Sequence, residues 1–186
     1  MKQPFMDLFP MPTVLVTSQN EGSNPNIITI AWTGILASGP QLVVYISVRP
    51  KGRYSHQLIT QSMEYVINIP SAEQIQIVDY CGLVSGKDVD KFQITGLTPV
   101  EPCHVKAPLI AECPVNLECR VRQIVSLGTH DVFIADVLAV HYNNEVLDES
   151  GKPDLDKIKP IAFCSNEYLL LSNQIGTLGY SKKLQK

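Results

Sequence analysis

Short runs of β-branched and aromatic residues, separated by turn-forming residues, dominate the first part of the chain. Runs at 13–18, 26–32, 42–48 and 64–69 have the composition of strands. The first two runs are joined by a segment rich in Asn, Gly and Pro at 19–25, which predicts a turn between antiparallel neighbours. The pattern therefore predicts a sheet that opens with antiparallel pairing.

Two short stretches between these strands have helical character. Residues 54–61 follow the chain-breaking Pro50 and Gly52, and Ser55 is placed to act as the N-cap of a helix. A second helix is predicted from residue 71, because Ser71 and Gln74 have the spacing of a capping box. One face of this helix would carry three apolar residues and Gly82 would end it: Ile75, Val78 and Cys81.

The second half of the chain contains the clearest alternation. Residues 115–122 alternate apolar with polar side chains, as in a half-buried antiparallel strand. The run 132–140 is apolar on both faces, which indicates a central strand or one covered by a second subunit. Because Gly128 lies in the turn between the two runs, a long hairpin is predicted.

The remaining segments are more polar or shorter. Residues 143–159 are too charged for a core and are expected to form a surface excursion. Short strands are expected at 161–163 and 168–171. The tail, 172–186, is expected to be mobile or draped over a partner.

Many short strands, few helices and two antiparallel hairpins predict a mainly β, closed or partly closed barrel. A chain of 186 residues with 45% hydrophobic residues is long enough for a single domain with its own core. A formal net charge of −3, without a long basic stripe, argues against nucleic acid and anionic membrane surfaces as partners.

The N-terminal residues, the lengths of the apolar runs and the cysteine spacing indicate the location of the protein and exclude some kinds of site. The first residues lack an apolar signal core and no apolar run reaches the length of a membrane span, so a cytoplasmic location is expected. The five cysteines are odd in number and contain no C-x-x-C pair, and the histidines are widely spaced. Neither a disulfide framework nor a metal site is therefore predicted.

The most informative stretch, 47–56, gathers cations and hydroxyl groups at the exit of a predicted strand. Guanidinium groups, hydroxyl groups and the free N–H groups of a helix start are what a phosphate monoester binds. A solvated basic loop on an acidic protein is the alternative, and the sequence leaves both open. The polar residues concerned are Ser47, Arg49, Lys51, Arg53 and Ser55.

Four other residues are candidates for ligand contact. Trp32 is the only tryptophan, and Asn26 could offer its amide to the edge of a heterocycle; a plain core indole is the alternative. Lys91 either adds a fourth positive charge or is a surface lysine paired with a neighbouring aspartate. His130, in the hairpin turn, either donates to a ligand or is an ordinary turn histidine.

Familiar catalytic motifs are missing from the sequence. It contains no G-x-S-x-G nucleophile elbow, and its cysteines lie in no activating motif. It also lacks G-x-G-x-x-G and the phosphate-binding G-x-x-x-x-G-K-[ST]. No catalytic side chain is predicted, and a Rossmann or P-loop fold is disfavoured.

Taken in order, these segments resemble the flavin reductase-like family, of the flavoredoxin type. The resemblance spans most of residues 10–165, and the order of the pieces makes it specific. The matching pieces are 12–17, 25–32, 49–56, 85–92 with its Asp90-Lys91-Phe92 close, and 128–131. One departure is Lys87-Asp88, where many relatives show Arg-Glu, which leaves the partner of Lys91 open.

The resemblance implies a fold, a cofactor and an activity. The fold is an antiparallel, Greek-key, FMN-binding split β-barrel with a few short helices, occupying residues 1–186 as one domain. The cofactor is noncovalent FMN near the interface of a homodimer, with NAD(P)H as reductant or a redox protein as partner. The activity is that of an FMN-dependent oxidoreductase, in which the flavin carries the chemistry. An FMN carrier or redox sensor without turnover is the alternative.

The resemblance also assigns the cofactor contacts. Arg53 and Ser55 would meet the phosphate, residues 47–49 would run beside the ring, and Phe163 would border it. Lys91 and His130 would complete the site, from either subunit. The full set of implied FMN contacts is Asn26, Ala31, Trp32, Thr33, Ser47, Val48, Arg49, Lys51, Arg53, Tyr54, Ser55, Lys91, His130 and Phe163.

Overall fold

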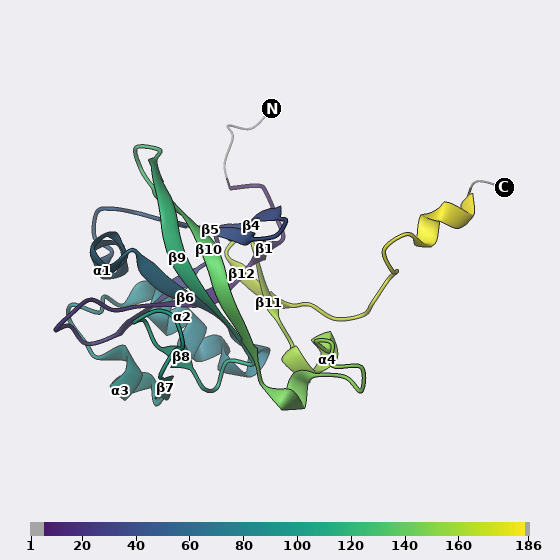
Figure 1. Cartoon of the computed structure of the whole chain (residues 1–186). Coiled ribbons are helices and arrows are strands. Elements are labelled where there is room, and N and C mark those ends of the chain that lie inside the picture. Colours follow the sequence, from purple (N-terminus) through teal and green to yellow (C-terminus); the bar gives the residue numbers. More distant parts are fainter. Residues whose placement is uncertain (1–5, 185–186) are drawn as a thin grey trace.

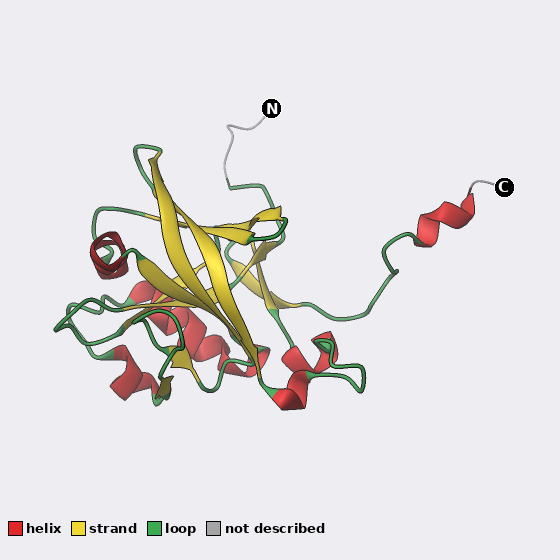
Figure 2. Ribbon diagram, in the orientation of Figure 1, coloured by secondary structure: helices red, strands yellow, loops and turns green. Residues whose placement is uncertain are grey.

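A seven-stranded antiparallel sheet forms the body of the protein, in a computed structural model that describes residues 6–184 (Figure 1, Figure 2). The strands lie in the order β3-β2-β6-β9-β10-β5-β4. Their bounds are β2 Val14–Ser18, β3 Asn26–Ile30, β4 Thr33–Ser38, β5 Leu42–Val48, β6 Glu64–Ile69, β9 Val115–Ser126 and β10 Asp131–Tyr142. The mainly β, antiparallel fold predicted from the sequence is confirmed.

The sheet closes on itself because of one short connection. β3 and β4 lie at opposite ends of the strand order, yet only residues 31–32 join them. Two residues cannot cross a flat sheet of seven strands spaced about 4.8 Å apart, so the sheet must curl until its edges meet. At the meeting point, the Ser47 N–H donates to the Trp32 carbonyl over 2.9 Å.

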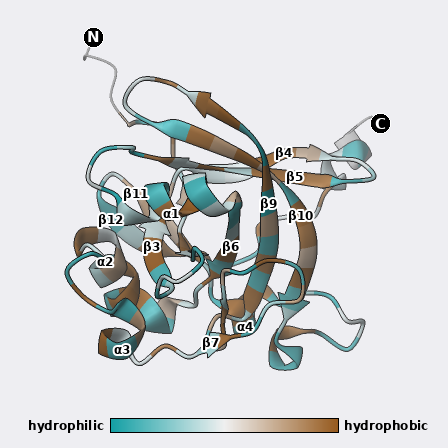
Figure 3. Ribbon diagram, turned by 60° about the vertical axis from the view of Figure 1, so that its left-hand side comes forward, coloured by the Kyte–Doolittle hydropathy of each residue, from teal (hydrophilic) through white to brown (hydrophobic). Residues whose placement is uncertain are grey.

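The core divides between the inside of the curled sheet and the layer under the helices. Ile28, Ile46, Tyr65 and Phe133 belong to the first cluster, and the sheet wraps around them. The second cluster packs α2 (Ile75–Leu83) and α3 (Lys91–Thr95) against the outside of β2 and β3. Figure 3 shows hydrophobic stretches along β9 and β10, in accord with their central place in the sheet.

Smaller elements complete the structure. Two minor sheets contain β1 Met11–Pro12, β11 Ile161–Cys164 and β12 Glu167–Leu170, and β7 Pro99–Val100 and β8 Leu109–Ile110. The remaining helices are α1 Tyr54–Ser62, α4 Leu155–Ile158, and the 3₁₀ turns η1 Ala72–Gln74, η2 Asn144–Val146 and η3 Tyr180–Leu184. Within residues 6–184, no helix has both the length and the apolar character needed to cross a membrane.

The helix at 71–82 differs from its prediction at one end. The capping box forms, with the Gln74 side chain accepting the Ser71 N–H at 2.9 Å. Gly82 was expected to end the helix, which is wrong, because α2 continues to Leu83. A Cβ at Gly82 would lie 3.3 Å from the Thr29 Cβ, so this glycine allows α2 to approach β3 closely.

The two long strands confirm one prediction and correct another. β10 pairs with both β9 and β5, as its apolar faces predicted for a central strand. The first half of β9 was expected to expose its polar face, but Asn116 and Glu118 are buried. The segment 101–110 covers this face, and its backbone N–H groups bind the Glu118 carboxylate.

Beyond β12 the chain leaves the body as residues 171–184, here called the arm, which run away from the sheet and end in η3 (Figure 1). Its apolar side chains Ile175 and Leu178 are fully exposed. Arms of this kind are costly in water unless another surface covers them.

Candidate functional site

The sheet closure creates a pocket of about 240 Å³, here called the seam pocket. The end of β3, the crossing to β4, the end of β5 and the β9–β10 turn all border it. From the candidates of the sequence analysis it brings together Ala31, Trp32, Ser47, Val48, Arg49, Arg53 and His130. Residues that are distant in sequence thus meet because the two sheet edges meet.

The centre of the seam pocket is an aromatic pair. The rings of Trp32 and His130 lie 4.4 Å apart between centroids, tilted by 39°. Arg49 Nε donates to His130 Nε2 at 3.4 Å, so the neutral ring carries its proton on Nδ1, which lies 3.1 Å from the Thr129 hydroxyl. Burial, and then the nearby Arg49 charge, lower the pKa of His130 below its usual value. At neutral pH, His130 therefore presents an uncharged ring beside the indole.

Arg53 lies where the seam pocket meets the C-terminal end of α2. Its Nη1 donates to the Gly82 carbonyl at 3.1 Å, one of the carbonyls left without a partner inside the helix. The negative end of a helix favours a cation at this place. The guanidinium group is thus held at the pocket wall by the helix end.

Lys91 is an interior residue, not the surface lysine that was one of the two interpretations of the sequence. Its side chain is buried, 3% exposed, and Nζ donates to the carbonyls of Ile27 and Cys81 at 2.6 and 2.8 Å. Burial lowers the pKa of Lys91 to about 8, with Cys81 opposing and Arg53 reinforcing the shift. The alternative of a surface lysine paired with a neighbouring aspartate is wrong, because Lys91 ties β3 to the end of α2. It is not among the lining residues of the seam pocket.

Asn26 and Ser55 also face inward. Both are buried, and Asn26 Nδ2 donates to Ser55 Oγ at 2.7 Å, which ties the first turn of α1 to β3. Gly86 leaves the space for this contact, since a Cβ there would lie 1.9 Å from Asn26 Oδ1. The expected N-cap role of Ser55 is wrong: Arg53 holds that position, without a side-chain hydrogen bond to the turn.

The remaining candidates lie around the seam pocket. Phe163 borders an adjoining pocket of about 180 Å³, which shares Thr29 and Ala31 with the seam pocket. Tyr54, the first residue of α1, lines a separate pocket together with Lys87. Two candidates lie outside these walls: Lys51 is exposed, and Thr33 donates its hydroxyl to the Tyr45 carbonyl.

The sequence analysis did not identify two residues that shape the surroundings of the seam pocket, Thr29 and His56. Thr29 lines both adjoining pockets, and its signal was a polar residue inside an otherwise apolar strand. His56, on α1, pairs with Asp131 at 2.7 Å and rests its ring edge against Phe133. This contact joins α1 to the base of the turn that carries His130, and no short motif links residues so far apart.

Comparison with known proteins identifies the family. The model described as "Flavin reductase like domain" matches residues 6–171. The chain belongs to the flavin reductase-like family. A relative from Archaeoglobus fulgidus, named only "uncharacterized protein", is 38% identical over 150 residues, 80% of this chain and 81% of its own.

Solved structures agree with the family and refine it. Flavoredoxin of Desulfovibrio vulgaris (Miyazaki F) superposes with a TM-score of 0.89 at 32% identity, covering 98% of this chain and 100% of its own. Flavoredoxin from Methanosarcina acetivorans gives 0.87 at 28% identity, covering 99% and 98%. A Shewanella frigidimarina structure described as having a split barrel domain gives 0.81 at 21% identity, covering 91% and 86%, which bears on the fold alone. The flavoredoxin-type resemblance and the split barrel are confirmed, and a flavin-related redox function is supported.

The lowered pKa of His130 gives a testable pH dependence. Because the folded environment disfavours the imidazolium, His130 should stay neutral until the pH falls below the ordinary histidine value of about 6.5. Trp32, the sole tryptophan, reports this step because its ring lies on His130. We expect its fluorescence to titrate with a midpoint below about 6.5, and His130→Gln to remove the transition. A midpoint at or above the ordinary value would contradict the assigned environment.

Proposed function

We propose that this protein is an FMN-dependent oxidoreductase that moves hydride or electrons between NAD(P)H, or a protein donor, and an acceptor. The observation that carries the proposal is the seam pocket, where a neutral aromatic pair adjoins two guanidinium groups. A flavin nucleotide has the matching parts, a flat ring system and an anionic phosphate. The family membership supports the flavin-related chemistry.

The size of the pocket is compatible with this ligand. The seam pocket and the adjoining Phe163 pocket have volumes of about 240 and 180 Å³ and share two wall residues. Together they fall within the range of about 300–1,000 Å³ that is usual for cofactor sites. Ala31 and Thr29 would then lie near the middle of a continuous groove.

The charges of the pocket favour FMN over FAD. Arg49 and Arg53 both line the seam pocket, and two guanidinium groups suit a single phosphate. The adenosine pyrophosphate of FAD would need a further set of contacts. Lys91 would support the site indirectly, by fixing the end of α2 that holds Arg53.

The protein residues would bind and orient, without taking part in bond making. Trp32 and His130 would form one wall for the ring, and the backbone of 47–49 would run along it. Bound FMN supplies hydride and one-electron chemistry itself. No side-chain acid or base is required, in accord with the absence of a nucleophile motif.

We also propose that the working unit is a homodimer. β4 is the last strand of the sheet, and its Ile35 is 67% exposed. An unpaired edge with apolar side chains is a surface that proteins usually cover. The arm offers a second apolar surface, and both could be buried by another copy of the chain.

Reduction by nicotinamide nucleotides tests the activity. We expect the FMN-loaded protein, kept free of oxygen, to lose its oxidised flavin absorbance on addition of NADH or NADPH. The same concentration of free FMN with the nucleotide is the control for the uncatalysed reaction. A flavin that stays oxidised with both nucleotides would favour the alternative, an FMN carrier or redox sensor without turnover.

Arg53→Ala tests the recognition of phosphate. A hydrogen bond to a charged group contributes about 1.5–3 kcal/mol, so the variant should bind FMN about ten- to a hundredfold more weakly. Riboflavin, which lacks the phosphate, should bind the variant and the parent protein almost equally. Equal losses for both flavins would show that Arg53 shapes the ring pocket through its bond to Gly82.

Replacement of the apolar arm residues tests the dimer. Ile175→Ser with Leu178→Ser removes two fully exposed apolar side chains, and Gln174→Ser is a matched control in the same segment. Because each buried aliphatic side chain contributes about 1.5–3 kcal/mol, the double variant should dissociate at least about tenfold more readily. Light scattering after gel filtration measures this. A monomeric parent protein at micromolar concentration would contradict the dimer, and an unchanged double variant would exclude the arm from the interface.

A further inference from the structure

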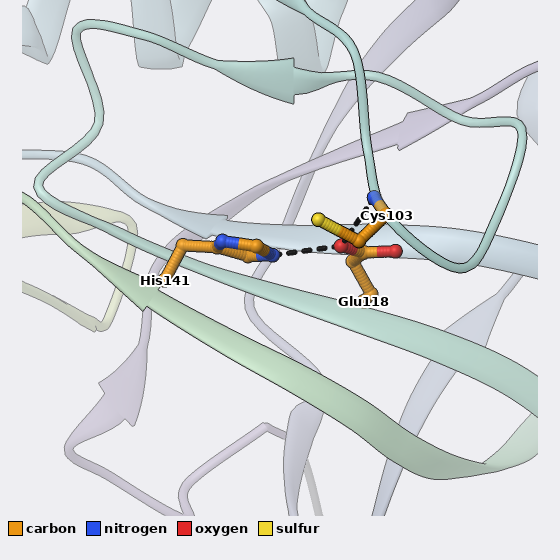
Figure 4. A group of neighbouring side chains, drawn as sticks. All are labelled: Cys103, Glu118 and His141. Carbon is orange, nitrogen blue, oxygen red and sulfur yellow. Dashed lines mark hydrogen bonds and ion pairs between the residues drawn. The ribbon is translucent and has the colours of Figure 1, made fainter.

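A cluster of potential metal ligands lies at the end of β10 remote from His130 (Figure 4). Cys103 comes from the segment 101–110, Glu118 from β9 and His141 from the last residues of β10. Their Sγ, carboxylate oxygen and ring nitrogen all lie within 4.8 Å of one another. Three separate elements thus bring three different ligand types to one point.

The carboxylate at the centre is held firmly. Glu118 is 0% exposed, and its oxygens accept the backbone N–H groups of Cys103, His104 and Val105 at 2.9, 2.6 and 3.1 Å. These bonds fix the carboxylate, as outer contacts do for metal ligands. The first of these bonds also brings the Cys103 thiol close to the carboxylate, because its donor is the backbone N–H of Cys103.

The remaining two ligands are accessible from solvent. Cys103 is exposed, and His141 is half-buried with Nε2 2.7 Å from Glu118 Oε1. A carboxylate only accepts hydrogen bonds, so His141 donates from Nε2 in this arrangement. Figure 4 shows the Cys103 sulfur on the same side of the carboxylate as the His141 ring. A metal ion could therefore enter from the open side without crossing the core.

We propose that Cys103, Glu118 and His141 bind a divalent zinc ion, with water as the fourth ligand. Thiolate, imidazole and carboxylate in one tetrahedral set are ligands that Zn²⁺ takes. On binding, Cys103 loses its thiol proton to solvent. The Nε2 proton of His141 leaves through solvent, the metal-bound ring carries a single proton on Nδ1, and Nε2 turns from Glu118 to the ion. No electrons are transferred.

The ion would fix the segment 101–110 to the hairpin. This segment covers the polar face of β9, so a bound ion would stabilise the folded state by mass action. The site is independent of the proposed flavin chemistry, because the seam pocket lies at the β9–β10 turn.

The test is metal binding by the purified full chain. Zn²⁺ affinity is measured by competition with a chromophoric chelator, and Co²⁺ serves as a spectroscopic probe whose charge-transfer band reports thiolate ligation. We expect one equivalent bound, a thiolate band, and a higher melting temperature with Zn²⁺. Cys103→Ser should remove the band and weaken Zn²⁺ binding beyond the about ten- to hundredfold typical of losing an outer contact. His141→Gln should weaken Zn²⁺ binding by a similar factor.

Matched controls separate this site from other thiols and from loss of fold. Cys164→Ser replaces a cysteine outside the ligand set and should leave Zn²⁺ binding and the Co²⁺ band unchanged. Circular dichroism checks that each variant is folded. Absence of saturable binding to the parent protein, or unchanged affinity in folded Cys103→Ser, would overturn the proposal and leave Glu118 as a contact that orders the segment.

Discussion

The two-residue link between β3 and β4 is the constraint on which the barrel and its pocket depend. It forces the outermost strands of the sheet together, and the Trp32 carbonyl then accepts a hydrogen bond from β5. A longer connection would let the edges separate and the sheet flatten. Because strand ends and their following loops meet only at this closure, the indole, the two arginines and the hairpin turn come together there.

Buried polar contacts hold the surroundings of the pocket in place. Lys91 satisfies one carbonyl of β3 and one of α2, and Asn26 with Ser55 ties α1 to the same strand. A buried carbonyl without a partner costs about 1–3 kcal/mol, so Lys91 at this point is favourable despite the desolvation that lowers its pKa. His56 and Asp131 act similarly between α1 and the hairpin. Each contact fixes an element that contributes a wall to the pocket.

The sequence predicted most strands because β-branched runs and turn residues are local signals. It missed β4, whose Gly34 packs under the Tyr45 ring and whose other residues include Ser38 and Ala37. β4 pairs with β5 through the short connection 39–41, but its small residues lack the β-branched and aromatic run that marks the other strands. The site residues that the sequence predicted well are likewise those with a local signal of charge or aromaticity. Arg49, Arg53 and Trp32 do line one pocket.

The environments of the buried polar residues were harder to predict from the sequence than the strands. A lysine in a polar loop has the same local composition whether it faces a ligand or a buried carbonyl, so sequence could not place Lys91. Glu118 is a charged residue that the pattern predicted to be exposed, because an alternating strand normally turns its charged side chains to solvent. It is buried because the segment 101–110 covers it. In both cases the deciding partner is a backbone group far away in sequence, which side-chain patterns do not reveal.

The electrostatics of the seam pocket follow from the same geometry. Arg53 is partly compensated by the carbonyl end of α2, whereas Arg49 is exposed and meets a neutral His130. Because burial and Arg49 lower the pKa of His130, this ring adds no third positive charge to the pocket at neutral pH. On a chain with a net charge of −3, Arg49 and Arg53 are then the lining residues of the seam pocket that attract anions. The pocket thus joins an uncharged aromatic pair to two fixed cations, the combination that suits a ligand with a flat neutral part and one anionic group.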